Sequence, residues 1–279
     1  MPRQPAAAQD EAAGQQATSA KRERLLEIYG AEAAEYAIYR DASRKEKVEL
    51  RPEPVYVWTN PERGGGQDGA VYLWTCRGRA EALGSFFSYP ASGQRHLSHE
   101  FHSLSLSVLD VERSGTHVST WMPQAPGIAI APIPDAPDPA PSAVQRLSQM
   151  HALTRDFSAS TKDDQGRSWE LRLLPQPLYR YESTDPDVGD GGLFGFVTSA
   201  GTDLEALLVI EARRSSRSGG LLWYHAAARF TDQELRMRYK GKEFFRAPII
   251  LYDKPYQDPE HRYRAFTDRD IPPVEAEPR

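Results

Sequence analysis

The sequence predicts an α+β fold made by tandem duplication, in which each half is a helix packed on an antiparallel β-sheet. The motif P-x-P-V-Y-x-W at residues 52–58 recurs as P-x-P-L-Y-x-Y at residues 175–181, an offset of 175 − 52 = 123. The stretch D-G-A-V-Y-L-W-T at residues 68–75 aligns with D-G-G-L-F-G-F-V at residues 190–197, an offset of 190 − 68 = 122. Two shorter matches follow at offsets of 124 and 123: Glu81-Ala82-Leu83 with Glu205-Ala206-Leu207, and Phe101-His102 with Tyr224-His225. Four matches in one order at nearly one offset indicate an internal repeat.

Length and composition are those of a soluble globular chain. The 279 residues allow one large domain or two of ordinary size. A net charge of −5 argues against nucleic acid as a partner, because nucleic-acid-binding proteins carry a basic surface. No run approaches the roughly 18 apolar residues of a membrane span. Cys76 is the only cysteine, so an internal disulfide and a cysteine zinc cluster are excluded.

Residues 1–20 are expected to form a disordered leader, because they lack aromatic residues and cannot bury enough apolar surface to fold. They also lack the apolar core of a signal peptide, so the chain as written is expected to be cytoplasmic, or exported if a signal peptide has been removed. The first repeat is expected over residues 21–122. It opens with a helix to about residue 47, because Leu25, Tyr29, Ala33, Tyr36 and Tyr39 recur at spacings of three and four.

Strands are expected at residues 55–59, 70–76 and 80–89, where β-branched and aromatic residues gather between turn residues. The glycine run at residues 64–66 precedes a strand. A phosphate-binding glycine loop opens a helix, so this run is interpreted as a flexible turn.

The stretch His96–His102 is the most suggestive local chemistry. Strand alternation places Glu100 and His102 on one face and His99 on the other, so His99 and His102 cannot chelate one metal. One interpretation makes His102 a buried structural histidine. The alternative makes Glu100 and His102 an acid/base or ligand pair at a cleft.

A proline-rich connector is expected at residues 123–142, with Ile128, Ile130 and Ile133 docking it. The second repeat is expected over residues 143–251, opening with a helix capped by Ser142. A Lys240-Gly241 hairpin turn is expected within it. Residues 252–279 are expected to be a charged tail.

Basic side chains along the second-half strands suggest an anion-binding sheet face, because several converging arginines bind carboxylate or phosphate. The candidate ligand-binding residues are Arg180, Arg213, Arg229, Arg236, Arg238 and His225. The alternative is a solvated face whose arginines pair with neighbouring glutamates.

The stretches D-G-A-V-Y-L-W-T, H-E-F-H-S-L-S and W-E-L-R-L-L-P-Q-P-L-Y-R-Y-E resemble a family of uncharacterised bacterial proteins, over most of residues 21–248. The resemblance implies no activity, cofactor or catalytic residue. The export signals frequent in that family keep a secreted location open.

No catalytic or cofactor-binding signature is present in the sequence, and no cofactor or metal is expected. The leading hypothesis is therefore a non-catalytic binding or interaction module, with a small anionic ligand or a protein partner at the junction of the repeats. The rival hypothesis is a hydrolytic enzyme using Glu100 and His102.

Overall fold

The computed structural model describes residues 6–61, 66–115, 120–199, 201–215, 219–251, 258 and 260–274. Strands make up 49% of the structure and helices 12%. The predicted α+β class is therefore wrong: the protein is mostly β, built from curled antiparallel sheets and not from a helix packed on a sheet in each half. The strands themselves explain this. The central strands bury nearly every residue on both faces, and the two large sheets pack against each other through one of those faces.

The first half and the C-terminal strand β18 together form an eight-stranded sheet in the order β18-β6-β5-β4-β2-β1-β7, with β3 pairing to β4 beside this path. Its strands are β1 (Tyr36–Tyr39), β2 (Lys47–Leu50), β3 (Tyr56–Asn60), β4 (Gln67–Cys76), β5 (Arg79–Ala91), β6 (Gln94–Ser103), β7 (Asp110–Arg113) and β18 (Tyr263–Ile271). Two-residue turns at Arg77-Gly78 and Ser92-Gly93, with positive φ at all four residues, connect β4, β5 and β6. Such turns match the twist of antiparallel hairpins.

The second half contains a six-stranded sheet in the order β11-β13-β14-β15-β8, with β12 pairing to β13, and a four-stranded sheet in the order β10-β9-β16-β17. Its strands are β8 (Ala131–Pro132), β9 (Phe157–Lys162), β10 (Ser168–Glu170), β11 (Arg172–Leu173), β12 (Tyr179–Tyr181), β13 (Val188–Val197), β14 (Leu204–Arg214), β15 (Leu221–Arg229), β16 (Glu234–Tyr239) and β17 (Lys242–Ala247). The predicted Lys240-Gly241 turn joins β16 to β17, with φ of 48° and 77°.

Strand pairing in the two halves follows a common register. Trp58 pairs with Gly69 between β3 and β4, and Tyr181 pairs with Gly191 between β12 and β13. These offsets, 181 − 58 = 123 and 191 − 69 = 122, equal those of the sequence motifs. In each pair the aromatic ring covers the glycine: a Cβ atom added to either glycine would lie 2.4 Å from the ring. What recurs in the two halves is therefore the order and register of the strands, and the two helices contribute little to this repeat.

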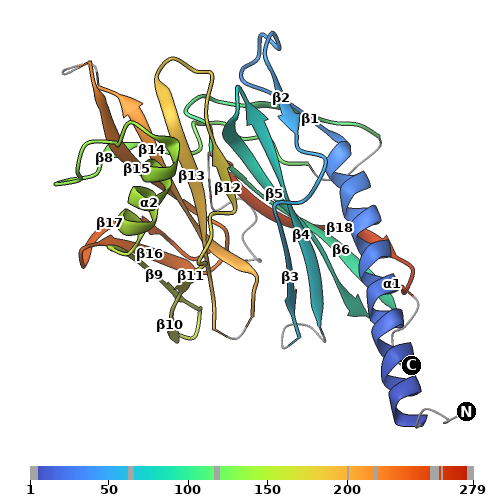
Figure 1. The fold of residues 1–279 in the computed structure, drawn as a ribbon. Coiled ribbons are helices and arrows are strands. Elements are labelled where there is room, and N and C mark those ends of the chain that lie inside the picture. The colour runs from blue at the N-terminus through green and yellow to red at the C-terminus, as the bar shows by residue number, and fades with distance from the viewer. Residues whose placement is uncertain are drawn as a thin grey trace, which may run out of the picture.

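The large sheets of the two halves face each other (Figure 1). Val71 and Leu83 of the first sheet share a buried cluster with Leu193 and Val209 of the second. Residues from the helix α1 (Ala6–Ala34) join a separate cluster on the other face of the first sheet. The helix α2 (Ala143–Thr154) and the four-stranded sheet contribute to a third cluster, on the outer face of the second sheet.

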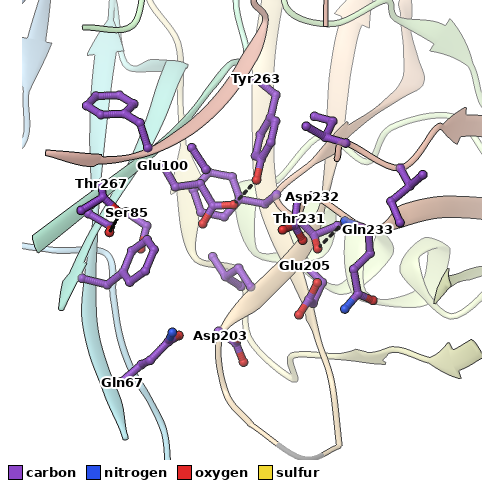
Figure 2. A pocket seen from close by; sticks show the side chains of 18 of the residues that line it. Gln67, Ser85, Glu100, Asp203, Glu205, Thr231, Asp232, Gln233, Tyr263 and Thr267 are labelled. Atoms are coloured by element: carbon purple, nitrogen blue, oxygen red, sulfur yellow. Dashed lines mark hydrogen bonds between the residues drawn. The ribbon is translucent and has the colours of Figure 1, made fainter. Parts of the chain in front are cut away.

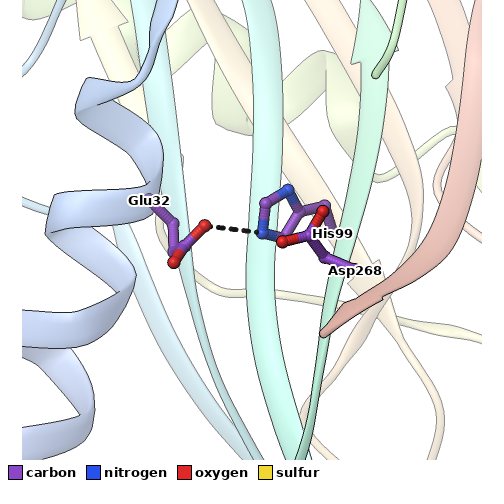
Figure 3. Close-up of side chains that lie close together, drawn as sticks. All are labelled: Glu32, His99 and Asp268. Carbon is purple, nitrogen blue, oxygen red and sulfur yellow. Dashed lines mark ion pairs between the residues drawn. The ribbon is translucent and has the colours of Figure 1, made fainter. Parts of the chain in front are cut away.

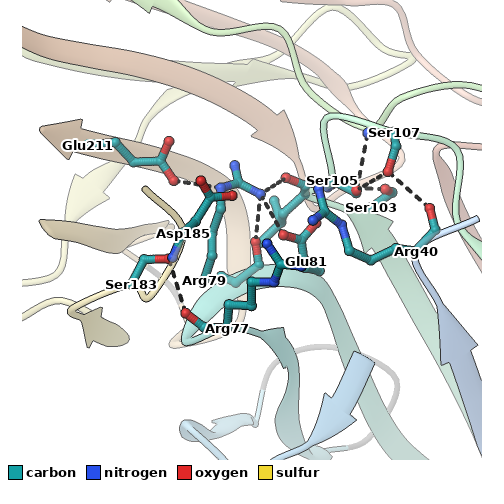
Figure 4. Close-up of polar contacts among 12 residues, drawn as sticks. Arg40, Arg77, Arg79, Glu81, Ser103, Ser105, Ser107, Ser183, Asp185 and Glu211 are labelled. Carbon is teal, nitrogen blue, oxygen red and sulfur yellow. Dashed lines mark hydrogen bonds and ion pairs between the residues drawn. The ribbon is translucent and has the colours of Figure 1, made fainter. Parts of the chain in front are cut away.

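A buried ionic network joins the two facing sheets near Arg79 (Figure 4). The Arg79 guanidinium lies 2.8 Å from Glu211 of β14 and 3.2 Å from Glu81 of β5. The Tyr181 hydroxyl also donates to Glu211. Burial by itself would lower the pKa of Arg79, but the charges of Glu211 and Glu81 outweigh it and hold that pKa above its usual value. The network therefore links side chains of both sheets within their interface.

The N-terminal helix differs from the prediction at both ends. α1 begins at Ala6, inside the stretch expected to be a disordered leader, and it ends at Ala34. The good helix propensity of alanine and glutamine accounts for the early start. Tyr36 and Tyr39, expected on the helix, lie in β1, where aromatic and β-branched neighbours favour a strand. Among the described residues, neither helix is long and apolar enough to cross a membrane.

The connector docks as predicted. Ile128 and Ile133 are buried in two different clusters, Ile130 packs against the first of them, and β8 pairs with β15. The Ser142 hydroxyl accepts the Gln145 amide at the start of α2, which confirms the predicted cap. Within the stretch expected to be a charged tail, residues 263–271 form β18 and pair with β6, while residues 252–257, 259 and 275–279 lie outside the described residues.

Candidate ligand pocket between the halves

A pocket of about 720 Å³ opens where the two halves meet (Figure 2). Its first-half wall comes from β3, β4, β5, β6 and β18. Its second-half wall comes from the β9–β10 turn, the start of β14, and the segments that follow β15 and β17. Because the site is assembled from segments far apart in the chain, its shape depends on how the sheets pack.

Strand alternation selects the side chains of the first-half wall. Ser85 and Phe87 of β5 pair with Glu100 and Ser98 of β6, and all four line the pocket. Phe86, which lies between Ser85 and Phe87, belongs to the cluster on the opposite face. A one-residue change of register would exchange the two faces, so the apolar cluster beneath the sheet also fixes the pocket.

Trp58 forms a fixed part of this wall. Its ring lies over Gly69, and its indole N–H donates to the Ser85 hydroxyl at 3.1 Å. Its ring centroid lies 5.6 Å from that of Phe87. Trp58 therefore presents an aromatic surface whose orientation is set by both a hydrogen bond and packing.

Glu100 is held by a tyrosine from the C-terminal strand. The Tyr263 hydroxyl donates to Glu100 Oε1 at 2.7 Å. Burial, and then the charge of Glu100, raise the pKa of Tyr263 well above its usual value, so the phenol keeps its proton at neutral pH. The Arg229 guanidinium lies 5.0 Å from the Tyr263 ring centroid, and its nitrogens donate to the backbone carbonyls of Thr231, Gln233 and Pro248.

Carboxyl groups dominate the charge of the lining. Six acidic residues contribute to it: Glu100, Asp163, Asp164, Asp203, Glu205 and Asp232. Among the described residues that line the pocket, none is a lysine, an arginine or a histidine. Asp203 accepts a hydrogen bond from the neutral Asn60 amide at 3.2 Å, and Asp163 accepts one from Arg167 at 2.7 Å. This arrangement can bind hydrogen-bond donors and positive charge.

The two residues of the predicted acid/base pair have different environments. Both lie on the expected face of β6, but only Glu100 lines the pocket. His102 is 4% exposed, and its Nδ1 atom lies 2.6 Å from the Ser103 carbonyl oxygen. Burial lowers the pKa of His102 to about 4, so its imidazole is neutral at pH 7. The structure brings Glu100 to the pocket and leaves His102 in the interior.

The predicted anion-binding residues do not converge. None lines the pocket, and each has a partner nearby: Arg180 contacts Asp190, Arg213 contacts Glu211, Arg236 contacts Glu234, Arg238 contacts Ser160, Arg229 contacts the backbone carbonyls given above, and His225 packs on Phe244. They are spread over β12, β14, β15 and β16. A shared bidentate anion site needs guanidinium groups that point to one place.

Glu32, His99 and Asp268 form a second group of potential metal ligands (Figure 3). The Arg113 guanidinium lies 3.1 Å from Glu32 and 2.6 Å from Asp268, and so supplies the positive charge between these carboxylates. His99 Nδ1 is hydrogen-bonded to the Tyr36 hydroxyl at 2.9 Å. Burial lowers the pKa of His99. The group is best explained as a buried ionic link between α1, β6, β7 and β18.

Sequence reasoning missed most of the acidic lining. Asp203 lies just before β14, Asp232 lies in the β15–β16 connection, and Tyr263 lies in the stretch expected to be a tail. No local motif links these positions, because they meet only after the sheets have packed. The one available signal was indirect: the strand alternation around His102, which placed Glu100 on a defined face.

Comparison with known proteins adds no function. No protein-family model, curated protein or solved structure matches this chain. The case for a function therefore rests on the geometry of the pocket.

Proposed function

We propose that this protein is a binding module that holds a small ligand in the pocket between its two halves. The observation that carries the proposal is the pocket itself. At about 720 Å³ it has the size of small-molecule sites, which typically span ~300–1,000 Å³. It also combines aromatic walls such as Trp58 and Phe87 with a few polar groups, as ligand sites do.

The position of the pocket supports a ligand more than a protein partner. The lining comes from both halves and is recessed between packed sheets, whereas protein interfaces are broad surfaces. The anionic ligand expected from the arginines finds no support in the lining, where those residues are absent. The rival hydrolase draws support from Glu100 alone, because His102 does not share the pocket.

A pocket-filling variant tests the proposal. Ala265 lies half-buried on β18 and lines the pocket, so Ala265→Trp should occupy the space that a ligand needs. Ala131→Trp is the matched control, because Ala131 is an exposed strand residue outside the pocket. A library of amines, sugars, nucleotides, phosphate and metal ions should be screened by thermal shift against wild type and both variants.

Compounds that bind the native state raise the melting temperature by mass action. At a concentration of 100 times Kd the stabilisation is about 2.7 kcal/mol. We expect at least one chemical class to stabilise wild type and Ala131→Trp but not Ala265→Trp. Stabilisation that survives in Ala265→Trp, or a library in which nothing stabilises wild type, would contradict the proposal.

A further inference from the structure

We infer that the ligand of this pocket is an organic cation, an amine or guanidinium group carried on an apolar body. The inference rests on the proposed binding function and adds the chemical class of the ligand. It follows from the charge of the lining, from its aromatic walls and from a buried amide oxygen beside it.

Negative charge is concentrated in the lining of the pocket. The six carboxyl groups of the lining carry a formal charge of −6 when ionised, whereas the whole chain of 279 residues carries −5. Like charges gathered in one partly enclosed space repel each other, and a bound cation relieves that repulsion. An anion entering the same space would meet the opposite effect, since the described lining offers no basic side chain.

Two arginines outside the lining offset part of this charge: Arg167 contacts Asp163 at 2.7 Å, and Arg229 acts on other carboxylates through space. Arg229 is buried, and Asp232, Asp258 and Glu100 all act on it electrostatically. Its guanidinium lies over the Tyr263 ring, and its three nitrogens donate to backbone carbonyls. Three of its N–H groups are thereby directed to the backbone, so its charge acts on the pocket carboxylates through space.

The walls favour an organic cation over a metal ion. Trp58, Phe87 and Phe230 line the pocket together with Ile250. Aromatic faces attract ammonium and guanidinium groups, and an apolar body gains by leaving water for such walls. A single hydrated metal ion would leave most of a space of about 720 Å³ unfilled.

Gln233 gives an observation independent of charge. It lines the pocket, and its Oε1 atom is buried with no hydrogen-bond partner within the described residues. That oxygen is sealed from solvent, so a ligand that supplies an N–H donor could satisfy it only after the side-chain amide turns. The terminal torsion of a glutamine side chain is soft, which lets the amide turn toward such a donor.

Three probes with one body and different charge test the inference on the full chain. They are 2-phenylethylamine, which is a cation at pH 7, 2-phenylethanol, which is neutral, and phenylacetate, which is an anion. Dissociation constants should be measured by calorimetry for wild type, Glu100→Gln and Ala265→Trp. Glu49→Gln serves as the matched control, because Glu49 is exposed on β2 and lies outside the pocket.

We expect wild type to bind the amine about tenfold or more tightly than the alcohol or the carboxylate. Glu100→Gln should weaken amine binding several-fold and lessen its salt dependence, and Glu49→Gln should change neither. Asp232→Asn repeats the test at a second lining carboxylate if Glu100→Gln proves unstable.

The two proposals fail in different ways. If the alcohol or phenylacetate binds as tightly as the amine or more tightly, and Ala265→Trp abolishes that binding, then the ligand is not a cation. The pocket would still be a binding site. Amine binding that is unchanged in both carboxyl variants would overturn it too. Binding that persists in Ala265→Trp would count against the pocket as the site, and against both proposals.

Discussion

His102 should make the protein less stable in mild acid. Its imidazole is 4% exposed, and burial lowers its pKa to about 4. Asp258 acts to raise that pKa, whereas Arg229 and Arg262 act to lower it. In the unfolded chain the pKa returns to its ordinary value of about 6.5. Between these two values the unfolded state binds a proton that the native state does not, so acid favours unfolding.

The direction and size of the effect follow from these two values. The contribution of neutral His102 is fully present above about pH 6.5 and is lost as the pH falls toward 4. The pKa values differ by about 2.5, and each pKa unit corresponds to about 1.36 kcal/mol, so the full loss is about 3 kcal/mol. At pH 5 the expected loss is about 2 kcal/mol.

Urea unfolding followed by circular dichroism at pH 7.5 and pH 5 measures this loss. His102→Gln keeps a hydrogen-bond donor but cannot titrate in this range, so the loss between the two pH values should be about 2 kcal/mol smaller than in wild type. His151→Gln, at the half-exposed end of α2, should retain the wild-type loss. An identical pH dependence in wild type and His102→Gln would refute a buried neutral imidazole.

Two further predictions concern the sheets. Arg79→Met removes a cation that contacts both buried carboxylates, Glu211 and Glu81, and leaves Arg213 beside Glu211. It should lower the free energy of unfolding by about 3 kcal/mol, and adding Glu211→Gln should recover part of that loss. Urea midpoints measure both, and a loss below about 1 kcal/mol would show that the network is dispensable. Gly69→Ala and Gly191→Ala should each lower the free energy of unfolding by about 1–3 kcal/mol, because the added methyl group meets an aromatic ring in either half. A loss at only one of the two positions would contradict the matching register.

Much of the strand arrangement could be predicted from the sequence. The motif offsets reappear in the pairings of Trp58 with Gly69 and Tyr181 with Gly191, because each motif places an aromatic residue opposite a glycine. The antiparallel pairing and the cap at Ser142 were also predictable, since both depend on local residue chemistry.

The fold class and most of the site could not be predicted. Tyrosines spaced by three suggested a long first helix, but Tyr36 belongs to β1. The buried runs in β4 and β13 do not reveal whether a helix or another sheet will cover them. The acidic pocket is a product of sheet packing, and residues such as Asp203 and Asp232 carry no local signal of it.

The indole resonance of Trp58 tests the central claim most directly. The chain has five tryptophans, and Trp58 is the one that lines the pocket. With 15N-labelled protein and indole peaks assigned by Trp→Phe variants, a saturating titration with 2-phenylethylamine should shift the Trp58 N–H peak. The peaks of Trp74, Trp121 and Trp223, which are buried outside the pocket, should stay in place. Measurable binding that leaves the Trp58 peak unmoved would contradict a ligand site between the two halves.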